Sequence, residues 1–223
     1  VSGEAMAGDQ KTGINGETVA KTAKMIKEIH CKGVQVAIVT GGGNFWRGRT
    51  SENMNRSTAD YIGMMATVMN SLALQEELKA QGVPTVVQSA IHMAQVAESF
   101  NRVKAEEHLN EGKVVIFAAG TGSPFFSTDT TAALRAAEIS AEVILMAKSI
   151  DAVYSADPKL DPNAIRYTEL SHGEVLEKDL KVMDATAAAL CRENHIAIHV
   201  FGLAEENGIM RALCGEKIGT IVR

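Results

Sequence analysis

The sequence predicts an α/β fold, a three-layer αβα sandwich whose central sheet is mostly parallel. Short runs of Val and Ile alternate with helical segments along the whole chain, which is typical of βαβ units. The runs are continuously apolar, as at residues 114–118, and this indicates strands that are covered on both faces. Glycine-rich turns follow three of these strands, where ligands collect in parallel sheets.

The expected elements follow one another in a regular order. Helical periodicity after a capping residue, Asn15, predicts a helix that ends before Gly33. Strands are expected at residues 34–39, 83–88, 114–118, 143–147, 196–203 and 220–222. Further helices are expected at residues 58–80, 93–109, 130–138, 173–178 and 184–193. Because no linker or repeat interrupts the series, residues 1–223 are expected to form a single domain.

The composition, 46% hydrophobic and 22% charged, is that of a soluble globular protein. The net charge of −5 argues against a general nucleic-acid surface, although a local basic pocket can still hold a small polyanion. No apolar run reaches the roughly 20 residues of a membrane span, and no signal peptide is evident. We therefore expect a cytoplasmic protein that binds neither nucleic acid nor membrane.

Cysteine and histidine spacing predicts no metal site held by the protein. Cys31, Cys191 and Cys214 lack zinc or redox spacing and are expected to be buried thiols. His195 and His199 form the only near pair of histidines, in a segment that resembles a strand. No carboxylate or cysteine stands at ligand spacing from this pair, so structural histidines are the simpler interpretation.

The segment at residues 120–129 has the chemistry of a phosphate site. It joins an apolar strand to an Ala-rich helix, and Ser127, Thr128 and Asp129 stand where helix caps stand. A helix start offers unpaired backbone N–H groups and partial positive charge to an anion. Glycines 120 and 122 allow the backbone to approach a ligand closely. An ordinary capped turn remains the alternative, because these residues favour helix starts whatever the function.

A second glycine turn, residues 41–44, follows the strand at residues 34–39, and Arg47 comes soon after it. Exposed backbone N–H groups and a guanidinium suit phosphate binding. A tight turn that only needs positive φ is the alternative. Residues 43–50 nearly match a P-loop but carry Arg49 in place of Lys, and Trp46 stands where the Rossmann fingerprint needs its last glycine. Both of those motifs are therefore discounted.

Six segments, in order and spacing, resemble the motifs of bacterial UMP kinases. They are Ser2-Gly3-Glu4-Ala5, Gly41-Gly42-Gly43-Asn44-x-x-Arg47-Gly48, residues 120–129, Asp151-x-Val153-Tyr154-x-x-Asp157-Pro158, residues 181–186 and residues 214–220. The likeness covers essentially the whole chain. It implies the amino-acid-kinase fold and transfer of the γ-phosphoryl group of ATP to UMP in pyrimidine nucleotide biosynthesis. It further implies use of Mg²⁺ and a cytoplasmic homohexamer.

The resemblance also implies roles for individual residues. Arg47 and Asp129 would be catalytic. UMP would be held by Gly42, Asp60, Thr121, Gly122, Ser123, Pro124, Phe125, Phe126, Ser127 and Thr128. ATP would be held by Ser2, Gly3, Gly43, Arg47, Lys148, Tyr154 and Asp157.

The chain departs from the family pattern at several positions. The family has a Lys before the residue that matches Val1, so the first strand is expected to be truncated here. Ser123 replaces the usual Asn, and Lys148 replaces a small polar residue. Residues 9–13 depart from the family's Gly-Phe-Gly pattern, so activation by GTP and inhibition by UTP are not carried over.

The carboxylates are assigned different tasks. Asp129 is expected to orient the family's Lys or a magnesium ion through its water shell, and Asp60 to accept ribose hydroxyls. Asp184 is either a support for the site or a helix N-cap. Two other functions stay open from the residues: a carbamate or carboxylate kinase of the same fold, and a nucleotide-sensing module without activity.

Overall fold

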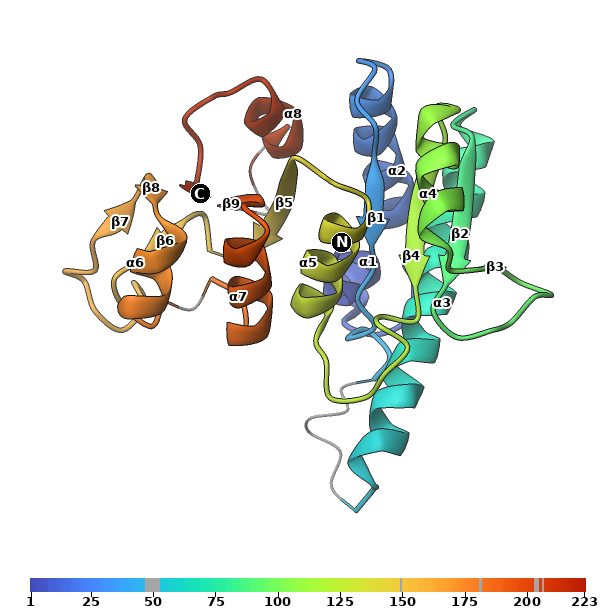
Figure 1. Cartoon of the computed structure of the whole chain (residues 1–223), viewed down its shortest axis with the longest axis horizontal. Coiled ribbons are helices and arrows are strands. Elements are labelled where there is room, and N and C mark those ends of the chain that lie inside the picture. The colour runs from blue at the N-terminus through green and yellow to red at the C-terminus, as the bar shows by residue number, and fades with distance from the viewer. Residues whose placement is uncertain (47–52, 149, 181, 203–204, 206) are drawn as a thin grey trace. The chain divides into compact units, whose positions relative to one another are not determined.

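The computed structural model describes residues 1–46, 53–148, 150–180, 182–202, 205 and 207–223. The chain divides into two compact units, Val1–Thr131 and Ala132–Arg223, drawn from blue to yellow-green and from yellow to red in Figure 1. Each unit has a sheet of its own. Helix α5 (Thr128–Glu138) begins in the first unit and continues in the second. The expected single domain over residues 1–223 stays a prediction.

The sheet of the first unit is parallel throughout, in the order β1-β4-β2-β3. Its strands are β1 (Ala37–Val39), β2 (Thr85–Ser89), β3 (Glu98–Ser99) and β4 (Val114–Ala118). Its helices are α1 (Gly3–Ala7), the 3₁₀-helix η1 (Gly8–Gln10), α2 (Gly16–His30), α3 (Arg56–Ala80) and α4 (Arg102–Asn110). Because β4 pairs with both β1 and β2, its register fixes the sheet, with Ile116 opposite Ile38 and Val87.

Strand β4 is covered on both faces, as its continuous apolar run predicts. Val114, Ile116 and Ala118 join the core that α2 and α3 complete. Alternate side chains of a strand point to opposite faces, and Phe117 packs edge-on against Phe100, with ring centroids 5.7 Å apart. All five residues of β4 are buried.

Asparagine side chains begin the three long helices of the first unit. Asn15 accepts from the backbone N–H of Thr18 at α2, and Asn101 accepts from that of Lys104 at α4. Asn55 does the same at α3. Each cap satisfies N–H groups that have no partner inside the helix.

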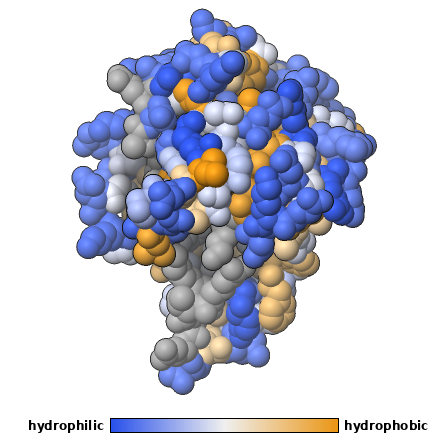
Figure 2. All heavy atoms as spheres, turned by 90° about the vertical axis from the view of Figure 1, so that its left-hand side faces the viewer, coloured by the Kyte–Doolittle hydropathy of each residue, from blue (hydrophilic) through white to orange (hydrophobic). Residues whose placement is uncertain are grey.

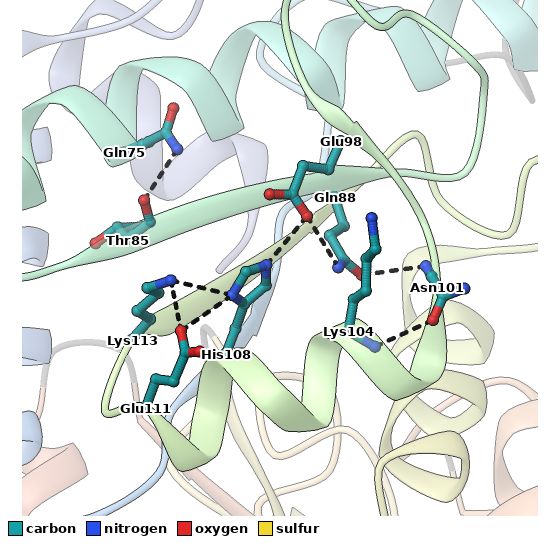
Figure 3. A network of polar contacts seen from close by, with 9 residues as sticks. All are labelled: Gln75, Thr85, Gln88, Glu98, Asn101, Lys104, His108, Glu111 and Lys113. Carbon is teal, nitrogen blue, oxygen red and sulfur yellow. Dashed lines mark hydrogen bonds and ion pairs between the residues drawn. The ribbon is translucent and has the colours of Figure 1, made fainter.

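A polar network ties β3 and α4 to the central strands (Figure 3). Glu98 accepts from the ring of His108 at 3.1 Å and from buried Gln88 at 3.4 Å. The ammonium of Lys113 lies 2.6 Å from the carboxylate of Glu111. Burial works to raise the pKa of Glu98, but hydrogen bonds from His108 and Gln88 outweigh it and hold that pKa below its usual value.

The second unit mixes parallel and antiparallel pairing. Its main sheet has the order β5-β9-β10-β8, in which β9 and β10 are antiparallel and the other neighbours are parallel. The strands are β5 (Val143–Lys148), β8 (Glu169–Leu170), β9 (Ala197–Gly202) and β10 (Thr220–Val222), with a hairpin of β6 (Val153–Tyr154) and β7 (Arg166–Tyr167). The helices are α6 (His172–Glu177), α7 (Ala185–Glu193) and α8 (Gly208–Leu213). Five of the seven pairings among the described strands of both units are parallel, so the predicted mostly parallel arrangement is confirmed.

The structure corrects several sequence expectations. The helix expected over residues 93–109 begins only at Arg102, because residues 98 and 99 form β3. Strand β1 begins only at Ala37, three residues later than expected. His195 lies in a left-handed turn before β9, not in the strand. Position 203, the expected strand end, lies outside the described residues.

Only one of the three thiols is buried as expected. Cys191 packs in the core of the second unit, and burial raises its pKa to about 11. Cys31 and Cys214 are exposed, each at the C-terminal end of a helix. The face of the protein in Figure 2 is mainly hydrophilic, with scattered apolar side chains. Among the described residues, every helix is too short or too polar to cross a membrane.

Candidate functional site

The glycine-bordered turns after β1 and β4 lie at one edge of the first unit's sheet. Strands β1 and β4 are neighbours and run parallel, as Figure 1 shows. The turn that follows β1 (residues 40–44) and the turn that follows β4 (residues 119–127) therefore leave the sheet at the same end. Ligands of open parallel sheets bind at this end.

The turn after β1 needs glycine because other backbone segments approach it closely. A Cβ on Gly42 would stand 2.6 Å from the carbonyl oxygen of Gly63 in α3. A Cβ on Gly41 would stand 2.9 Å from the nitrogen of Gly3. Glycines 41, 42 and 43 all have φ outside the left-handed region, so a turn that only needs positive φ is the wrong explanation.

The first residues of the chain lie against this turn. The nitrogen of Val1 donates to the carbonyl of Val39 at 2.7 Å, and Gly41 donates to the carbonyl of Val1 at 2.8 Å. Ser2 caps α1 by accepting from the nitrogen of Ala5. A Cβ on Gly3 would meet the nitrogen of Gly43 at 2.5 Å. Gly3, a predicted ATP residue, is thus brought beside Gly43, and Ser2, another, lies against Gly41.

The turn after β4 has a strained backbone. Ala119, Gly120, Gly122 and Phe125 all have φ between 58° and 80°, and such values are uncommon for residues other than glycine. A Cβ on Gly122 would lie 3.0 Å from the carbonyl oxygen of Ala90. The residues of this turn therefore follow a fixed path, and Ser123, Phe125 and Phe126 are exposed along it.

Helix α5 begins immediately after this turn. Ser127 is its cap, because its side chain accepts from the nitrogen of Thr130 at 3.0 Å. Thr128 and Asp129 are already helical, so only one of the three expected caps acts as the cap. Asp129 lies in the first turn, and its carboxylate interacts electrostatically with the nitrogen of Val1. The carboxylate thus lies beside the N-terminal segment.

Asp60 connects the first turn of α3 to the turn after β4. Its two oxygens accept from Nε of Arg56 at 2.9 Å and 2.8 Å, and one of them accepts from the nitrogen of Phe125 at 2.9 Å. The Arg56 guanidinium also lies 5.6 Å from the centre of the Phe125 ring, a cation–π distance. A carboxylate has about four acceptor positions, so Asp60 retains capacity for a further donor.

Sequence reasoning missed Arg56. The spacing of Arg56 and Asp60 is the i,i+4 spacing of helical ion pairs, and that signal could have found it. Arg47, the predicted catalytic guanidinium, lies outside the described residues.

Comparisons with known proteins identify the family of this chain. The family model of the amino acid kinase family matches residues 1–202. This chain belongs to the amino acid kinase family. It is 56% identical to the uridylate kinase of Pediococcus pentosaceus, over 100% of this chain and 94% of that protein.

Solved structures of UMP kinases and of a uridylate kinase are similar as well. The crystal structure of UMP kinase from Ureaplasma parvum has a TM-score of 0.94 at 40% identity and covers 99% of this chain and 95% of its own. The UMP kinase of Bacillus anthracis has a TM-score of 0.96 at 35% identity, with coverage of 100% and 93%. The uridylate kinase of Archaeoglobus fulgidus reaches 0.73 at 30% identity, with coverage of 94% of each chain. The amino-acid-kinase fold and the resemblance to UMP kinases are therefore confirmed.

The second unit of this amino acid kinase holds Tyr154 by a carboxylate. The Tyr154 hydroxyl donates to Asp151 at 2.9 Å, and Arg166 donates to the other oxygen of Asp151 at 3.1 Å. The hydrogen bond to Asp151 raises the pKa of Tyr154. Burial works to raise the pKa of Asp151, but the bonds from Tyr154 and Arg166 outweigh it, so that pKa is lowered. Sequence reasoning had not assigned Asp151 or Arg166 a role.

Lys148 and Asp157, the other predicted ATP residues of the second unit, lie near Tyr154 in the chain, and Asp184 lies farther along it. Lys148 ends β5. Asp157 is exposed and accepts from the nitrogen of Lys159 at 2.9 Å, so it shapes the loop that follows β6. Asp184 caps α7 by accepting from the nitrogen of Ala187 at 3.0 Å, which confirms the capping alternative for that residue.

Proposed function

We propose that the protein transfers the γ-phosphoryl group of ATP to UMP, giving UDP and ADP in pyrimidine nucleotide biosynthesis. The observation that carries this proposal is the shared edge of the first unit's sheet. Two glycine-bordered turns leave the sheet there, and the second leads directly into the start of α5. Backbone N–H groups at such positions suit phosphate oxygens. The similarity to uridylate kinases supports UMP as the acceptor.

UMP would lie against the turn after β4. Gly42, Asp60 and residues 121–128 would hold it, with Asp60 accepting the ribose hydroxyls beside exposed Phe125 and Phe126. The ribose would use the acceptor capacity that Arg56 and the Phe125 nitrogen leave on Asp60.

ATP would be held by Ser2, Gly3, Gly43, Arg47, Lys148, Tyr154 and Asp157. The Asp151 and Arg166 pair fixes the Tyr154 hydroxyl, which prepares that side chain for a nucleotide. Ser2 and Gly3 are supported as part of the set because Gly3 lies against Gly43 and Ser2 lies against Gly41.

The reaction needs no general base. The second pKa of a phosphate monoester is about 6, so at neutral pH the attacking oxygen of UMP is already mostly deprotonated. The protein has to bring two polyanions together and neutralise the charge that spreads over the transferred group. Backbone N–H groups of the two turns and the guanidinium of Arg47 would provide this stabilisation.

Magnesium would enter with ATP. Mg²⁺ is usually bound by one or two carboxylates together with substrate phosphates and waters, and Asp129 at the start of α5 fits that pattern. Among the described residues, no group of three or more potential ligands could hold an ion alone, so the nucleotide would have to supply most of its ligands. When bound, the ion would neutralise phosphate charge. Asp129 would orient either this ion or the lysine that the family has before the position of Val1.

Self-association as a homohexamer in the cytoplasm is part of the proposal. Met64 and Val68 of α3 are buried in the core, but four apolar side chains of the same helix are 37–44% exposed. These are Tyr61, Ile62, Met65 and Met69. Such a row favours a contact with another subunit. Light scattering of the purified protein should give six times the mass of one chain, and a monomeric mass would contradict this part.

A coupled assay of ADP release separates the proposed function from its alternatives. The protein is mixed with Mg-ATP and, in separate reactions, UMP, CMP, glutamate or carbamate. UMP should give the highest kcat/KM. Preference for carbamate or glutamate would identify another kinase of the same fold, and UMP binding without any turnover would identify a nucleotide sensor.

A further inference from the structure

We propose that Thr67 and Asn70 are positioning residues that hold the two glycine-bordered turns from one buried face of helix α3. The inference rests on the proposed function and deepens it. Neither side chain would touch a nucleotide; each would fix the backbone that does.

The inner face of α3 is unusually polar for a helix in a core. Thr67, Asn70 and Ser71 are 7%, 0% and 0% exposed, although Leu74 and Leu78 of the same helix are apolar core residues. A buried polar group costs free energy unless it is hydrogen-bonded. The hydrogen-bond partners of these side chains therefore indicate why polar residues stand at these buried positions.

Asn70 holds the turn after β1. Its side-chain nitrogen donates to the carbonyl of Gly41 at 2.7 Å and to the amide oxygen of Asn44 at 2.8 Å. Asn44 returns a bond to the oxygen of Asn70 at 3.0 Å and donates its other hydrogen to the carbonyl of Gly13 at 2.7 Å. Both ends of the turn, Gly41 and Asn44, are thus tied to one side chain of α3.

Thr67 holds the turn after β4. Its hydroxyl accepts from the nitrogen of Ala119 at 2.8 Å and donates to the carbonyl of Met64 at 2.7 Å. Ala119 is the first residue of that turn, and its φ of 60° is strained for alanine. The hydroxyl therefore satisfies a buried N–H at the point where the backbone leaves β4.

The two residues are three positions apart and so lie on one side of the helix. The rigid body of α3 sets the spacing between the two turns, in addition to the β1–β4 pairing. Since a phosphoryl donor and acceptor must be aligned to within a fraction of an ångström, this cross-link would act on the reaction rate. A role in folding alone would change stability without changing the rate constants of the folded enzyme.

Thr67→Val tests the inference because it removes the hydroxyl and keeps the branched shape. Thr22→Val is the matched control. Thr22 is also buried, at 8% exposure, but among the described residues its hydroxyl bonds within its own helix, at the carbonyl of Thr18. Thr67→Ser retains a hydroxyl and should restore function. All three variants are compared with the wild-type full-length protein.

The first readout is amide hydrogen exchange in the absence of nucleotide. The N–H of Ala119 should exchange about tenfold faster or more in Thr67→Val, because the bond that protects it is lost. Exchange there should be unchanged in Thr22→Val. Unchanged protection of Ala119 in Thr67→Val would overturn the inference. This result does not depend on which substrate the enzyme uses.

The second readout is the rate of UMP phosphorylation. We expect kcat to fall about tenfold or more in Thr67→Val, since misalignment acts on the chemical step, and to stay within about twofold of wild type in Thr22→Val and Thr67→Ser. Equal losses in Thr67→Val and Thr22→Val would overturn the inference. A wild-type protein that binds UMP without turnover would instead refute the proposed function.

If Thr67→Val does not fold, Asn70→Ala gives the equivalent test at the other turn. Faster exchange across residues 41–44 together with a loss of kcat supports the inference, and wild-type values for either measurement overturn it.

Discussion

Replacing Gly42 by alanine tests whether the turn after β1 must lie against helix α3. The added Cβ would stand 2.6 Å from the carbonyl oxygen of Gly63 and 2.9 Å from the Cβ of Ala66. Ordinary van der Waals contact begins near 3.4 Å, so the turn and the helix would have to move apart by a large part of an ångström. Both are main-chain segments of a packed core, which does not yield easily.

We expect Gly42→Ala to lower both the stability and the activity of the protein. Overpacking of this kind lowers the free energy of unfolding by about 1–3 kcal/mol. A shift approaching 1 Å in a substrate-binding segment costs up to about a hundredfold in rate, so we expect kcat/KM for UMP to fall by about 10- to 100-fold in Gly42→Ala. Urea unfolding and the coupled ADP assay measure the two effects.

Gly63→Ala is the matched control, because it adds the same methyl group on the other side of the contact. Its nearest neighbour would be the Trp46 ring at 4.0 Å. Alanine inside a helix is favoured over glycine by about 0.5–1 kcal/mol, so this variant should be more stable and keep its activity. Wild-type kcat/KM in Gly42→Ala, or an equal loss in Gly63→Ala, would refute the reasoning.

Three further outcomes are expected. Asp129→Asn should lose about a hundredfold or more of turnover and still bind UMP in calorimetry; unchanged turnover would remove Asp129 from the mechanism. Asp60→Asn should raise KM for UMP about tenfold or more, because hydrogen bonds to a charged acceptor contribute about 1.5–3 kcal/mol. The variant should also lose the preference for UMP over 2′-deoxy-UMP. A preference equal to that of wild type would contradict the proposed binding of ribose by Asp60. Burial lowers the pKa of His172 below 6.5, so its contribution to stability is complete above pH 6.5 and is lost as pH falls through the lowered pKa. His172→Gln should therefore lose less free energy of unfolding than wild type between about pH 7.5 and about pH 5.5 in urea; equal losses would argue against that shift.

Long apolar patterns made much of the fold predictable. Strands β4 and β10 have the predicted bounds, because each is a Val- and Ile-containing run between turn residues. Strand β3 escaped prediction because both of its residues are exposed and polar, so no hydrophobic pattern marks it. Helix α1 has only five residues, fewer than helical periodicity can reveal.

The antiparallel pairing of β9 and β10 was not predictable either. The sequence gives no sign of strand direction when the connection contains a short helix, as α8 does here. The prediction that Cys31 and Cys214 are buried was wrong for a related reason. Each stands at the C-terminal end of a helix, where exposure depends on packing beyond the local sequence.

The candidate site was predictable where glycines and hydroxyls follow a strand, but its supports were not. Gly42 and Gly122 do lie at close approaches, but to the backbone of Gly63 and Ala90, so their expected contacts with a nucleotide stay a prediction. Thr67 and Asn70, in contrast, look in sequence like ordinary polar residues of a long helix. Only the structure shows that they face inward and bond to Ala119 and Gly41.

A crystal structure of the full-length protein with UMP and a non-hydrolysable ATP analogue is the most direct test of the site. It should show the two phosphate chains facing each other, bound by backbone N–H groups of residues 41–43 and of the segment that leads into α5. Phosphates bound elsewhere, with both turns empty, would contradict the assignment of this sheet edge as the active site.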